Sequence, residues 1–122
     1  MKFKRGDIVW ADFRSGSGHV QRGRRPCLIV STNRANGKAL TVNVIPGTTK
    51  IGKYFAFHVH IKPEDVTGYV MKETVFLVEQ ITTIDKDQIL CMAGIVNKGK
   101  MSEVDKLIKR QLGFNEGGNK SE

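Results

Sequence analysis

The alternation of hydrophobic and polar residues along the chain predicts short β-strands followed by a helix. Segments rich in β-branched and aromatic residues lie at 6–13, 26–32, 40–46, 55–61 and 74–80, with a further candidate strand at 89–96. The first segment has apolar side chains at both alternating sets of positions, among them Trp10 and Phe13. We therefore expect residues 6–13 in the centre of a sheet that is covered on both faces, with Trp10 and Phe13 in the core.

Local signals predict how these elements are joined and where the helix begins and ends. Asn36-Gly37 separates the segments 26–32 and 40–46 and is typical of a tight hairpin turn, so we expect these two strands to pair antiparallel. Ser102 begins a capping-box pattern, and apolar residues at helical spacing follow it. Gly113 stands where such a helix would end, which predicts a helix over residues 103–112.

The length of 122 residues suits a single domain with a modest hydrophobic core. We predict one domain over residues 1–114 and a flexible tail over 115–122, where the sequence NEGGNKSE is polar and rich in glycine. Five or six closely spaced strands and one terminal helix predict a mainly β fold. Its expected form is a small, strongly bent antiparallel sheet or barrel.

The positive charge is concentrated in the first half of the chain. Residues 1–62 contain twelve of the twenty Lys and Arg residues but only two acids, Asp7 and Asp12, whereas residues 63–122 are net negative. Each Lys or Arg placed on a phosphate releases counterions, so a basic surface of this size favours a polyanionic partner. Nucleic acid is the partner we expect.

Targeting and cysteine signals point to the cytoplasm. No apolar run approaches the roughly 20 residues that a membrane helix needs, and the N-terminus lacks the apolar stretch of a secretory signal, so we expect no membrane contact. Cys27 and Cys91 stand alone, without a CxxC or Cys/His array. They are therefore interpreted as buried thiols in a reducing compartment rather than as zinc ligands.

The segment 14–25, RSGSGHVQRGRR, is the long loop of the predicted fold. Three glycines, four arginines and one histidine stand between two predicted strands, and no acid balances the charge. A solvated hairpin tip is the alternative, but arginines without acids favour a loop that closes over phosphate groups.

Five motifs, in order along residues 4–113, together resemble the MazF/PemK family of bacterial toxins. They are RGDIVWADF, the Gly/His/Gln/Arg loop, GRRPCLIVS, VIPGTT and VEQITTID. The resemblance implies a small SH3-like barrel of the CcdB/PemK type with a C-terminal helix, which forms homodimers. It also implies cleavage of single-stranded RNA without a metal ion or other cofactor, and inhibition by an acidic cognate antitoxin that covers the RNA groove.

The resemblance assigns the family's catalytic arginine to Arg25 and its catalytic threonine to Thr48. Arginine suits this chemistry because its planar fork binds two phosphoryl oxygens and stays charged as negative charge builds up on them. Pro26 follows Arg25 at the start of an apolar strand and restricts the backbone there. For Thr48 the alternative is a turn residue that hydrogen-bonds its own backbone, which only a position beside Arg25 would outweigh.

Two residues are candidates for proton transfer. His19 matches a histidine that some family members carry in the loop, although Val20 stands where many have glutamate; its side-chain type suits acid–base catalysis. Glu79, in the VEQ motif, is the second candidate, with a role in orienting Arg25 or in the dimer as its alternative. Where the family often has arginine after this motif, the chain has Thr82.

Further polar residues are expected along the RNA path. His58 and His60 share a strand face, but no Asp, Glu or Cys in that strand completes a metal site, so we expect a polar face that flanks RNA and no metal. The predicted RNA-binding residues are Arg14, Gln21, Arg22, Arg24, Thr49, Lys50, Lys53 and His58.

Three classes of function are compatible with this sequence. The first is a sequence-specific endoribonuclease toxin that cuts mRNA by 2′-OH attack and leaves a 2′,3′-cyclic phosphate and a 5′-OH. The second is a CcdB-like gyrase poison without nuclease activity, and the third is a barrel that binds nucleic acid without cleaving it. The Arg25 and Thr48 assignments favour the first.

Overall fold

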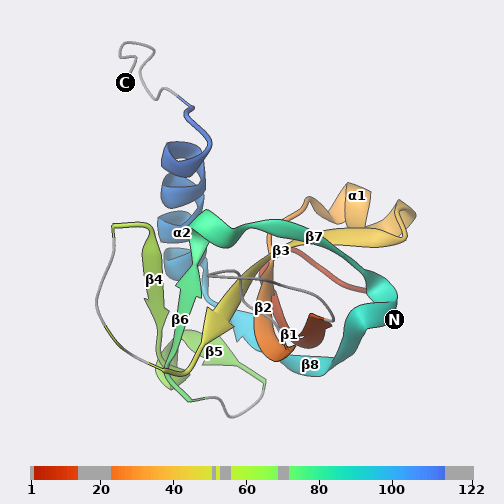
Figure 1. The fold of residues 1–122 in the computed structure, drawn as a ribbon, viewed down its shortest axis with the longest axis horizontal. Coiled ribbons are helices and arrows are strands. Elements are labelled where there is room, and N and C mark those ends of the chain that lie inside the picture. Colours follow the sequence, from red (N-terminus) through yellow and green to blue (C-terminus); the bar gives the residue numbers. More distant parts are fainter. Residues whose placement is uncertain (1, 14–22, 51, 53–55, 69–71, 115–122) are drawn as a thin grey trace.

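The computed structural model describes residues 2–13, 23–50, 52, 56–68 and 72–114, which form a bent antiparallel barrel with a C-terminal helix (Figure 1). The strands are β1 (Asp7–Phe13), β2 (Gly23–Ile29), β3 (Thr41–Thr48), β4 (His58–Ile61), β5 (Val66–Thr67), β6 (Thr74–Leu77), β7 (Thr82–Asp85) and β8 (Ile89–Val96). They pair in the order β4-β6-β3-β2-β1-β8-β5, and β7 pairs with β3 outside this path. The predicted mainly β barrel is confirmed.

Strand β1 is central, as its two apolar faces predict. It pairs with β2 on one side and β8 on the other. Ile8 belongs to one hydrophobic cluster, whereas Val9 and Phe13 belong to a second cluster on the other face. The prediction for Trp10 is wrong, because 36% of this side chain is exposed. Trp10 is on the same face of β1 as Ile8, but it lies beyond the edge of the first cluster. Neither Trp10 nor its cross-strand partners, Pro26 and Cys91, belong to that cluster.

Strands β2 and β3 pair antiparallel as predicted, but the expected hairpin turn between them is wrong. The connection contains the short helix α1 (Asn33–Lys38), whose first turn is capped by the Thr32 hydroxyl. Gly37 does not adopt the positive φ that a tight Asn-Gly turn requires. The Asn36 side chain is buried and donates to the Ser31 carbonyl at 2.9 Å, so it holds the helix against the end of β2 instead of forming a turn.

Strand β3 changes partners along its length. Its first residues pair with β7, its middle residues pair with β2, and Gly47 and Thr48 pair with β6. A Cβ atom at Gly47 would lie 2.7 Å from Thr74 Cγ2 and 3.0 Å from the Phe76 ring. Glycine therefore allows β3 to pass close to β6, which brings the end of β3 beside the β4–β6 edge of the barrel.

The observed strands differ from the predictions in three places: the start of β4, the end of β6 and the presence of β7. Within the predicted segment 55–61, the observed strand begins at His58. Strand β6 ends at Leu77, and the 3-10 helix η2 (Val78–Gln80) follows it. Strand β7 was not predicted, because it is short and only Ile84 in it is buried, so it lacks a repeated hydrophobic alternation.

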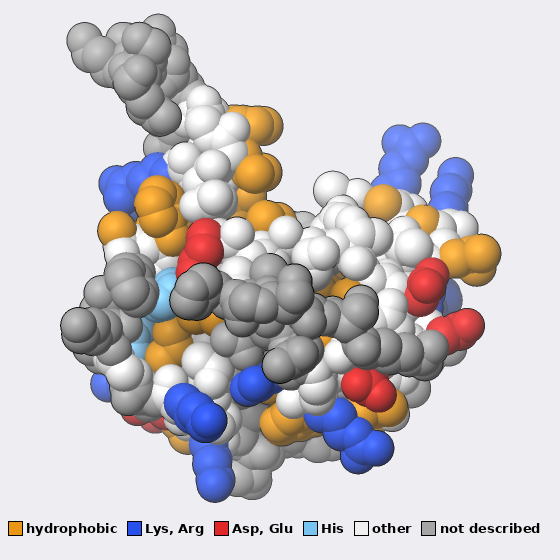
Figure 2. Space-filling model, viewed as in Figure 1, with side chains coloured by type: hydrophobic (Ala, Val, Ile, Leu, Met, Phe, Trp, Pro, Cys, Tyr) orange, Lys and Arg blue, Asp and Glu red, His pale blue; other side chains and the backbone are white. Residues whose placement is uncertain are grey.

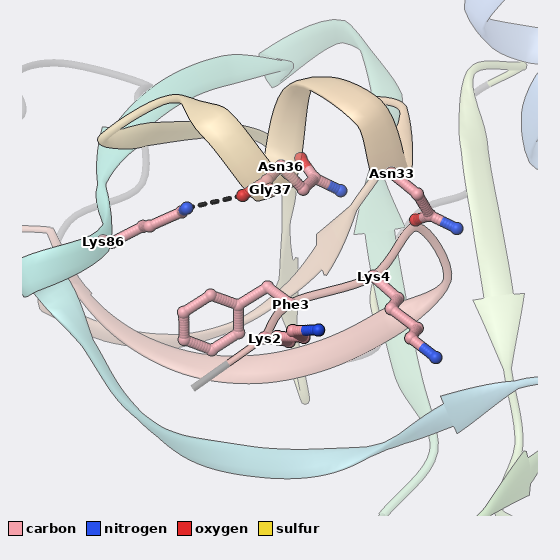
Figure 3. A pocket seen from close by; sticks show the side chains of 7 residues that line it. All are labelled: Lys2, Phe3, Lys4, Asn33, Asn36, Gly37 and Lys86. Atoms are coloured by element: carbon pink, nitrogen blue, oxygen red, sulfur yellow. Dashed lines mark hydrogen bonds between the residues drawn. The ribbon is translucent and has the colours of Figure 1, made fainter.

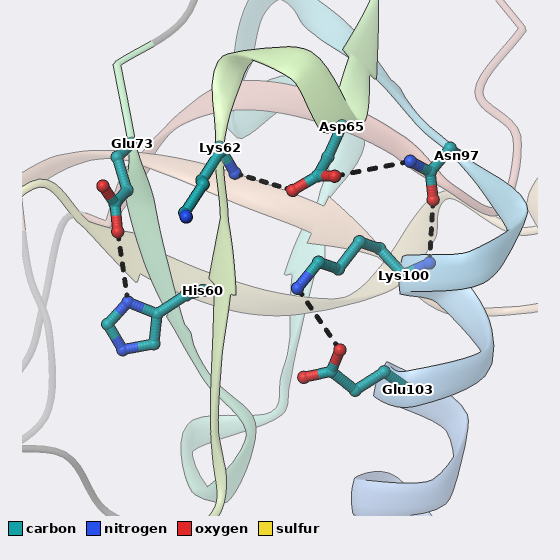
Figure 4. A network of polar contacts seen from close by, with 7 residues as sticks. All are labelled: His60, Lys62, Asp65, Glu73, Asn97, Lys100 and Glu103. Atoms are coloured by element: carbon teal, nitrogen blue, oxygen red, sulfur yellow. Dashed lines mark hydrogen bonds and ion pairs between the residues drawn. The ribbon is translucent and has the colours of Figure 1, made fainter.

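Helix α2 (Lys98–Gln111) begins earlier than Ser102 predicts. Asn97 is the N-cap, and its side-chain oxygen accepts from the Lys100 N–H at 2.8 Å. Asn97 also contacts Asp65 of the 3-10 helix η1 (Pro63–Asp65), which joins the helix start to the end of β4 (Figure 4). Val104 anchors the helix in the first cluster. The predicted end is confirmed, because Gly113 has φ of 81° directly after the C-cap.

The two cysteines differ in environment. Cys27 is fully buried in the second cluster, as predicted, and burial raises the pKa of its thiol to about 12 despite the nearby charge of Arg25. Cys91 is exposed, so the prediction of a buried thiol is wrong there. It lies in β8 opposite Trp10, beyond the first cluster.

Candidate active site

The sheet brings Arg25 and Thr48 to neighbouring strands. The last pair between β2 and β3 joins Cys27 and Pro46, and continuing this register by two residues places Arg25 opposite Thr48. Residues opposite each other on paired strands share a face, with Cα atoms about 5 Å apart. The β2–β3 pairing thus bridges much of the sequence separation of 23 residues between Arg25 and Thr48, and we expect their side chains on one face at this end of the sheet.

The same face continues across β6 and β4. Thr48 pairs with Val75, and Val75 pairs with His60, so these residues form one row across the sheet. Leu77 and His58 form the next row. Figure 2 shows the histidine side chains on this side of the molecule beside a hydrophobic patch, with Lys and Arg side chains below them. We call the Arg25, Thr48, His58 and His60 side of the sheet the site face.

Glu79 contacts the site face through His58. Its carboxylate Oε2 lies 3.1 Å from His58 Nε2, and the His58 side chain is 8% exposed whereas that of Glu79 is 38% exposed. Glu79 stands in η2 directly after β6, because β6 ends at Leu77, and η2 also packs beside β3. A carboxylate that is accessible to solvent and bonded to an imidazole is an arrangement suited to proton transfer.

Thr48 already uses its hydroxyl oxygen to hold the end of β3. The Lys50 N–H donates to Thr48 Oγ1 at 3.1 Å, so the turn-residue alternative describes this contact correctly. The hydroxyl oxygen is the acceptor in this bond, so the hydroxyl hydrogen remains available for donation. Thr48 can therefore be fixed by its own backbone and still donate to a phosphoryl oxygen.

Arg25 and Arg24 take different positions on β2. Arg25 is half-buried and close enough to the Cys27 thiol for its charge to lower that pKa, opposing the effect of burial. Arg24 is exposed and, by strand alternation, lies on the opposite face, where it pairs with Asp12 of β1. Of the two arginines, only Arg25 shares the site face with Thr48.

Other predicted site residues are exposed or lie outside the described residues. Thr49 and Lys50 are exposed at the end of β3, next to the site face. The predicted residues outside the described part of the chain are Arg14, His19, Gln21, Arg22 and Lys53. The predicted tail, 115–122, also lies outside it.

Glu73 was missed by the sequence reasoning. Its Oε2 lies 3.3 Å from His60 Nδ1, so each histidine of β4 contacts a different glutamate (Figure 4). The signal was present but weak: Glu73 and Glu79 flank β6, the strand that pairs with β4, and that pairing is not readable from composition. Within the described ranges, no three His, Cys, Asp or Glu side chains gather as a metal site, and no helix is long and apolar enough to cross a membrane.

The fold and the site face define a small barrel protein whose arginine, threonine and histidine–glutamate pair suit the cleavage of a phosphodiester bond. Residues 4–112 match the model of the PemK-like, MazF-like toxin of type II toxin–antitoxin systems. The chain belongs to this family, as its motifs predicted.

Known relatives extend this comparison. The chain is 33% identical to the endoribonuclease MazF of Staphylococcus epidermidis over 112 residues, which is 92% of each chain. MazF of Deinococcus radiodurans has a TM-score of 0.79 and 24% identity, covering 93% of this chain and 98% of that one. An endoribonuclease in complex with its cognate antitoxin, from a mycobacterial species, has a TM-score of 0.73 and 23% identity, covering 94% and 97%. At these identities the two structures support the fold.

Proposed function

We propose that this protein is an endoribonuclease, the toxin of a bacterial toxin–antitoxin pair, which cleaves single-stranded RNA without a metal ion. The observation that supports the proposal most directly is the β2–β3 register, which ends at the pair Cys27–Pro46 and, continued by two residues, would set Arg25 opposite Thr48. Family membership and the endoribonuclease MazF relative support it. The proposed reaction is attack of the 2′-OH on the adjacent phosphorus, which breaks the bond to the 5′ oxygen and yields a 2′,3′-cyclic phosphate and a 5′-OH.

Arg25 is proposed to bind the phosphoryl oxygens as negative charge develops on them. Its half-buried position on a paired strand restricts its motion, and a guanidinium in such a place stabilises charge more strongly than one in bulk water. Thr48 is proposed to donate its hydroxyl hydrogen to the same phosphate. Both groups are held by backbone pairing, so little reorganisation is needed when RNA binds.

Proton transfer is proposed to involve Glu79 together with His58, or His19 from the loop. The contact of Glu79 Oε2 with His58 Nε2 at 3.1 Å supports the first choice. In this arrangement one group removes the proton of the 2′-OH and a second protonates the leaving 5′ oxygen. Arg24, Thr49 and Lys50, exposed beside this end of the sheet, are proposed to bind the backbone of the bound strand.

The family and the positive charge of the first half of the chain together suggest the partners of this protein. We propose that an acidic cognate antitoxin covers the site face, as the complex of the mycobacterial relative includes an antitoxin, and that the protein acts as a homodimer. The cytoplasmic location predicted from the sequence belongs to the same proposal.

The decisive test is cleavage of a long RNA by the purified full chain in EDTA, with mapping of the new 5′ ends. We expect discrete cuts with 5′-hydroxyl ends. Cleavage that requires added Mg²⁺, or cuts with 5′-phosphates, would contradict the proposed chemistry. Intact RNA together with inhibited gyrase would instead favour a CcdB-like poison.

The Arg25→Ala variant supplies the matched control for contaminating nucleases. Removing a charge partner of the transition state typically costs about 100-fold or more in rate, so we expect cleavage to fall by that factor with an unchanged melting temperature. Arg24→Ala, the adjacent exposed arginine of the other face, should weaken RNA binding but retain the cleavage rate at saturating RNA. Equal rate losses in the two variants would remove the special role assigned to Arg25.

A further inference from the structure

A second candidate site lies at the end of β2 that is remote from Arg25. It is a pocket of about 250 Å³, seen in Figure 3, lined by Lys2, Phe3, Lys4, Asn33, Asn36, Gly37 and Lys86. Asn33 begins α1, which follows the C-terminal end of β2, whereas Arg25 lies near the N-terminal end. The path from Arg25 to Ile29 spans about 13 Å at 3.3 Å per residue, so the pocket is separate from the proposed cleavage site.

Hydrogen bonds fix the walls of this pocket. The Lys4 N–H donates to Asp7 Oδ2 at 2.9 Å, which holds the N-terminal segment. The Arg5 N–H donates to Asn33 Oδ1 at 2.7 Å, which joins that segment to α1. Lys86 Nζ donates to the Asn36 carbonyl and closes the other end (Figure 3). The pocket is therefore formed before any ligand binds, which lowers the entropic cost of binding.

The charge of the lining is positive and not balanced locally. Three lysines line the pocket and no acidic side chain does. Among the described residues, the structure shows no ion pair for Lys2, Lys4 or Lys86. The acids nearest in sequence are Asp7, whose carboxylate accepts from the Lys4 N–H, and Asp85 and Asp87, which flank Lys86. The net positive charge of the lining favours a bound anion.

We propose that this pocket binds the phosphoryl group of a nucleotide. Lysine ammonium groups bind phosphate as point charges, and the side-chain amide N–H of Asn33 adds a polar donor beside them. The apolar Phe3 side chain, only 9% exposed, forms a wall on which a sugar or base can pack. A volume of about 250 Å³ is below the range of drug-sized pockets and suits a phosphate with part of its nucleoside. Two sources share this chemistry: a free mononucleotide and the 5′-phosphate end of an RNA.

Binding can be tested on the full chain by NMR titration with AMP, inorganic phosphate and a 2′-O-methyl RNA that cannot be cleaved. We expect AMP or 5′-phosphorylated RNA to shift the backbone amides of Asn33, Asn36, Gly37 and Lys86. Because the RNA lacks the attacking 2′-OH, the result does not depend on nuclease activity. Absence of shifts at these amides with every probe at millimolar concentration would overturn the proposal.

Charge-reversal variants assign the binding to the lysines. Lys2→Glu with Lys4→Glu should weaken the affinity at least about tenfold, whereas Lys2→Arg with Lys4→Arg should retain it. The matched control is Lys98→Glu with Lys106→Glu, two exposed lysines of α2 with the same charge change. Equal loss in the control and the pocket variant would mean nonspecific attraction and would contradict a built site.

The RNA arms distinguish the two sources. If the ligand is an RNA end, 5′-phosphorylated 2′-O-methyl RNA shifts the pocket amides and the same RNA with a 5′-OH does not. If the ligand is a free nucleotide, AMP shifts them and neither RNA does. Shifts confined to residues around Thr48 with both RNAs, and none in the pocket with AMP, would reject the pocket while leaving the proposed nuclease intact.

Discussion

At the scale of single residues, Cys27 shows how the core and the site face constrain each other. Its thiol lies in the second hydrophobic cluster two residues from Arg25, and it donates to the Arg25 carbonyl at 3.6 Å. Burial raises its pKa from 9.0 to about 12, so the thiol stays protonated at any physiological pH. A neutral thiol is a poor nucleophile, which makes Cys27 a packing residue beneath the site rather than a catalytic one.

The raised pKa predicts a loss of stability in alkaline solution. Above pH 9 the unfolded chain releases the Cys27 proton while the folded chain keeps it until about pH 12, so the free energy of unfolding falls as pH rises between these values. At pH 10.5 this effect amounts to at most about 2 kcal/mol. Urea unfolding at pH 8 and pH 10.5 should therefore show a smaller decrease for Cys27→Ala than for the wild type. An equal decrease in both proteins would contradict the assignment.

The residues of the candidate site were predictable to different degrees. Arg25 and Thr48 were identified from motifs next to strand ends, and the pairing of β2 with β3 sets these ends on neighbouring strands. The contact between Glu79 and His58 was not predicted, because it depends on β6 ending at Leu77 and on the η2 turn that follows. Side-chain contacts across non-consecutive strands such as β4 and β6 require a register that no local pattern specifies.

At the scale of elements, the start of α2 shows which of two possible N-cap residues begins the helix. Ser102 has the capping-box pattern, but the helix begins five residues earlier because the Asn97 side chain caps it and also contacts Asp65. We expect Asn97→Ala to lower the free energy of unfolding by about 1 kcal/mol, and Ser102→Ala to leave it unchanged or raise it slightly. Thermal unfolding of the two variants checks this, and a larger loss for Ser102→Ala would show that the helix starts at the later site.

Two glycines provide a second comparison at this scale. A Cβ atom at Gly47 would lie 2.7 Å from Thr74 Cγ2, whereas one at Gly37 meets nothing within 4 Å. Gly47→Ala should therefore destabilise the barrel by about 1 to 3 kcal/mol through overpacking where β3 passes β6. Gly37→Ala should be neutral or stabilise by up to about 1 kcal/mol, because alanine is the better helix former in α1. Urea unfolding of both variants gives the sign, and similar losses in both would contradict the close approach of β3 and β6.

At the scale of the whole molecule, the basic half of the chain is divided between two ends of the sheet. Arg24, Arg25 and Lys50 lie at the site end, whereas Lys2 and Lys4 line the pocket beside α1. The sequence predicted the charge excess and a polyanionic partner, but a linear count cannot show that strand β2 carries its basic residues away from those of the N-terminal segment. The separation gives the molecule two positive regions, one proposed for cleavage and one for a phosphoryl group.

This division predicts how binding of a non-cleavable single-stranded RNA depends on salt. Each phosphate contact contributes about 0.7 to the slope of log K against log salt concentration for a single strand. Arg24→Gln with Lys50→Gln should therefore reduce the slope by about 1.4 if the strand contacts both residues, which are exposed at the site end of the sheet. Lys98→Gln with Lys106→Gln removes the same charge from α2 and should leave the slope unchanged. Fluorescence anisotropy at several salt concentrations measures both slopes. Equal reductions would mean that RNA responds only to net charge, and that the site end of the sheet has no specific role in holding the strand.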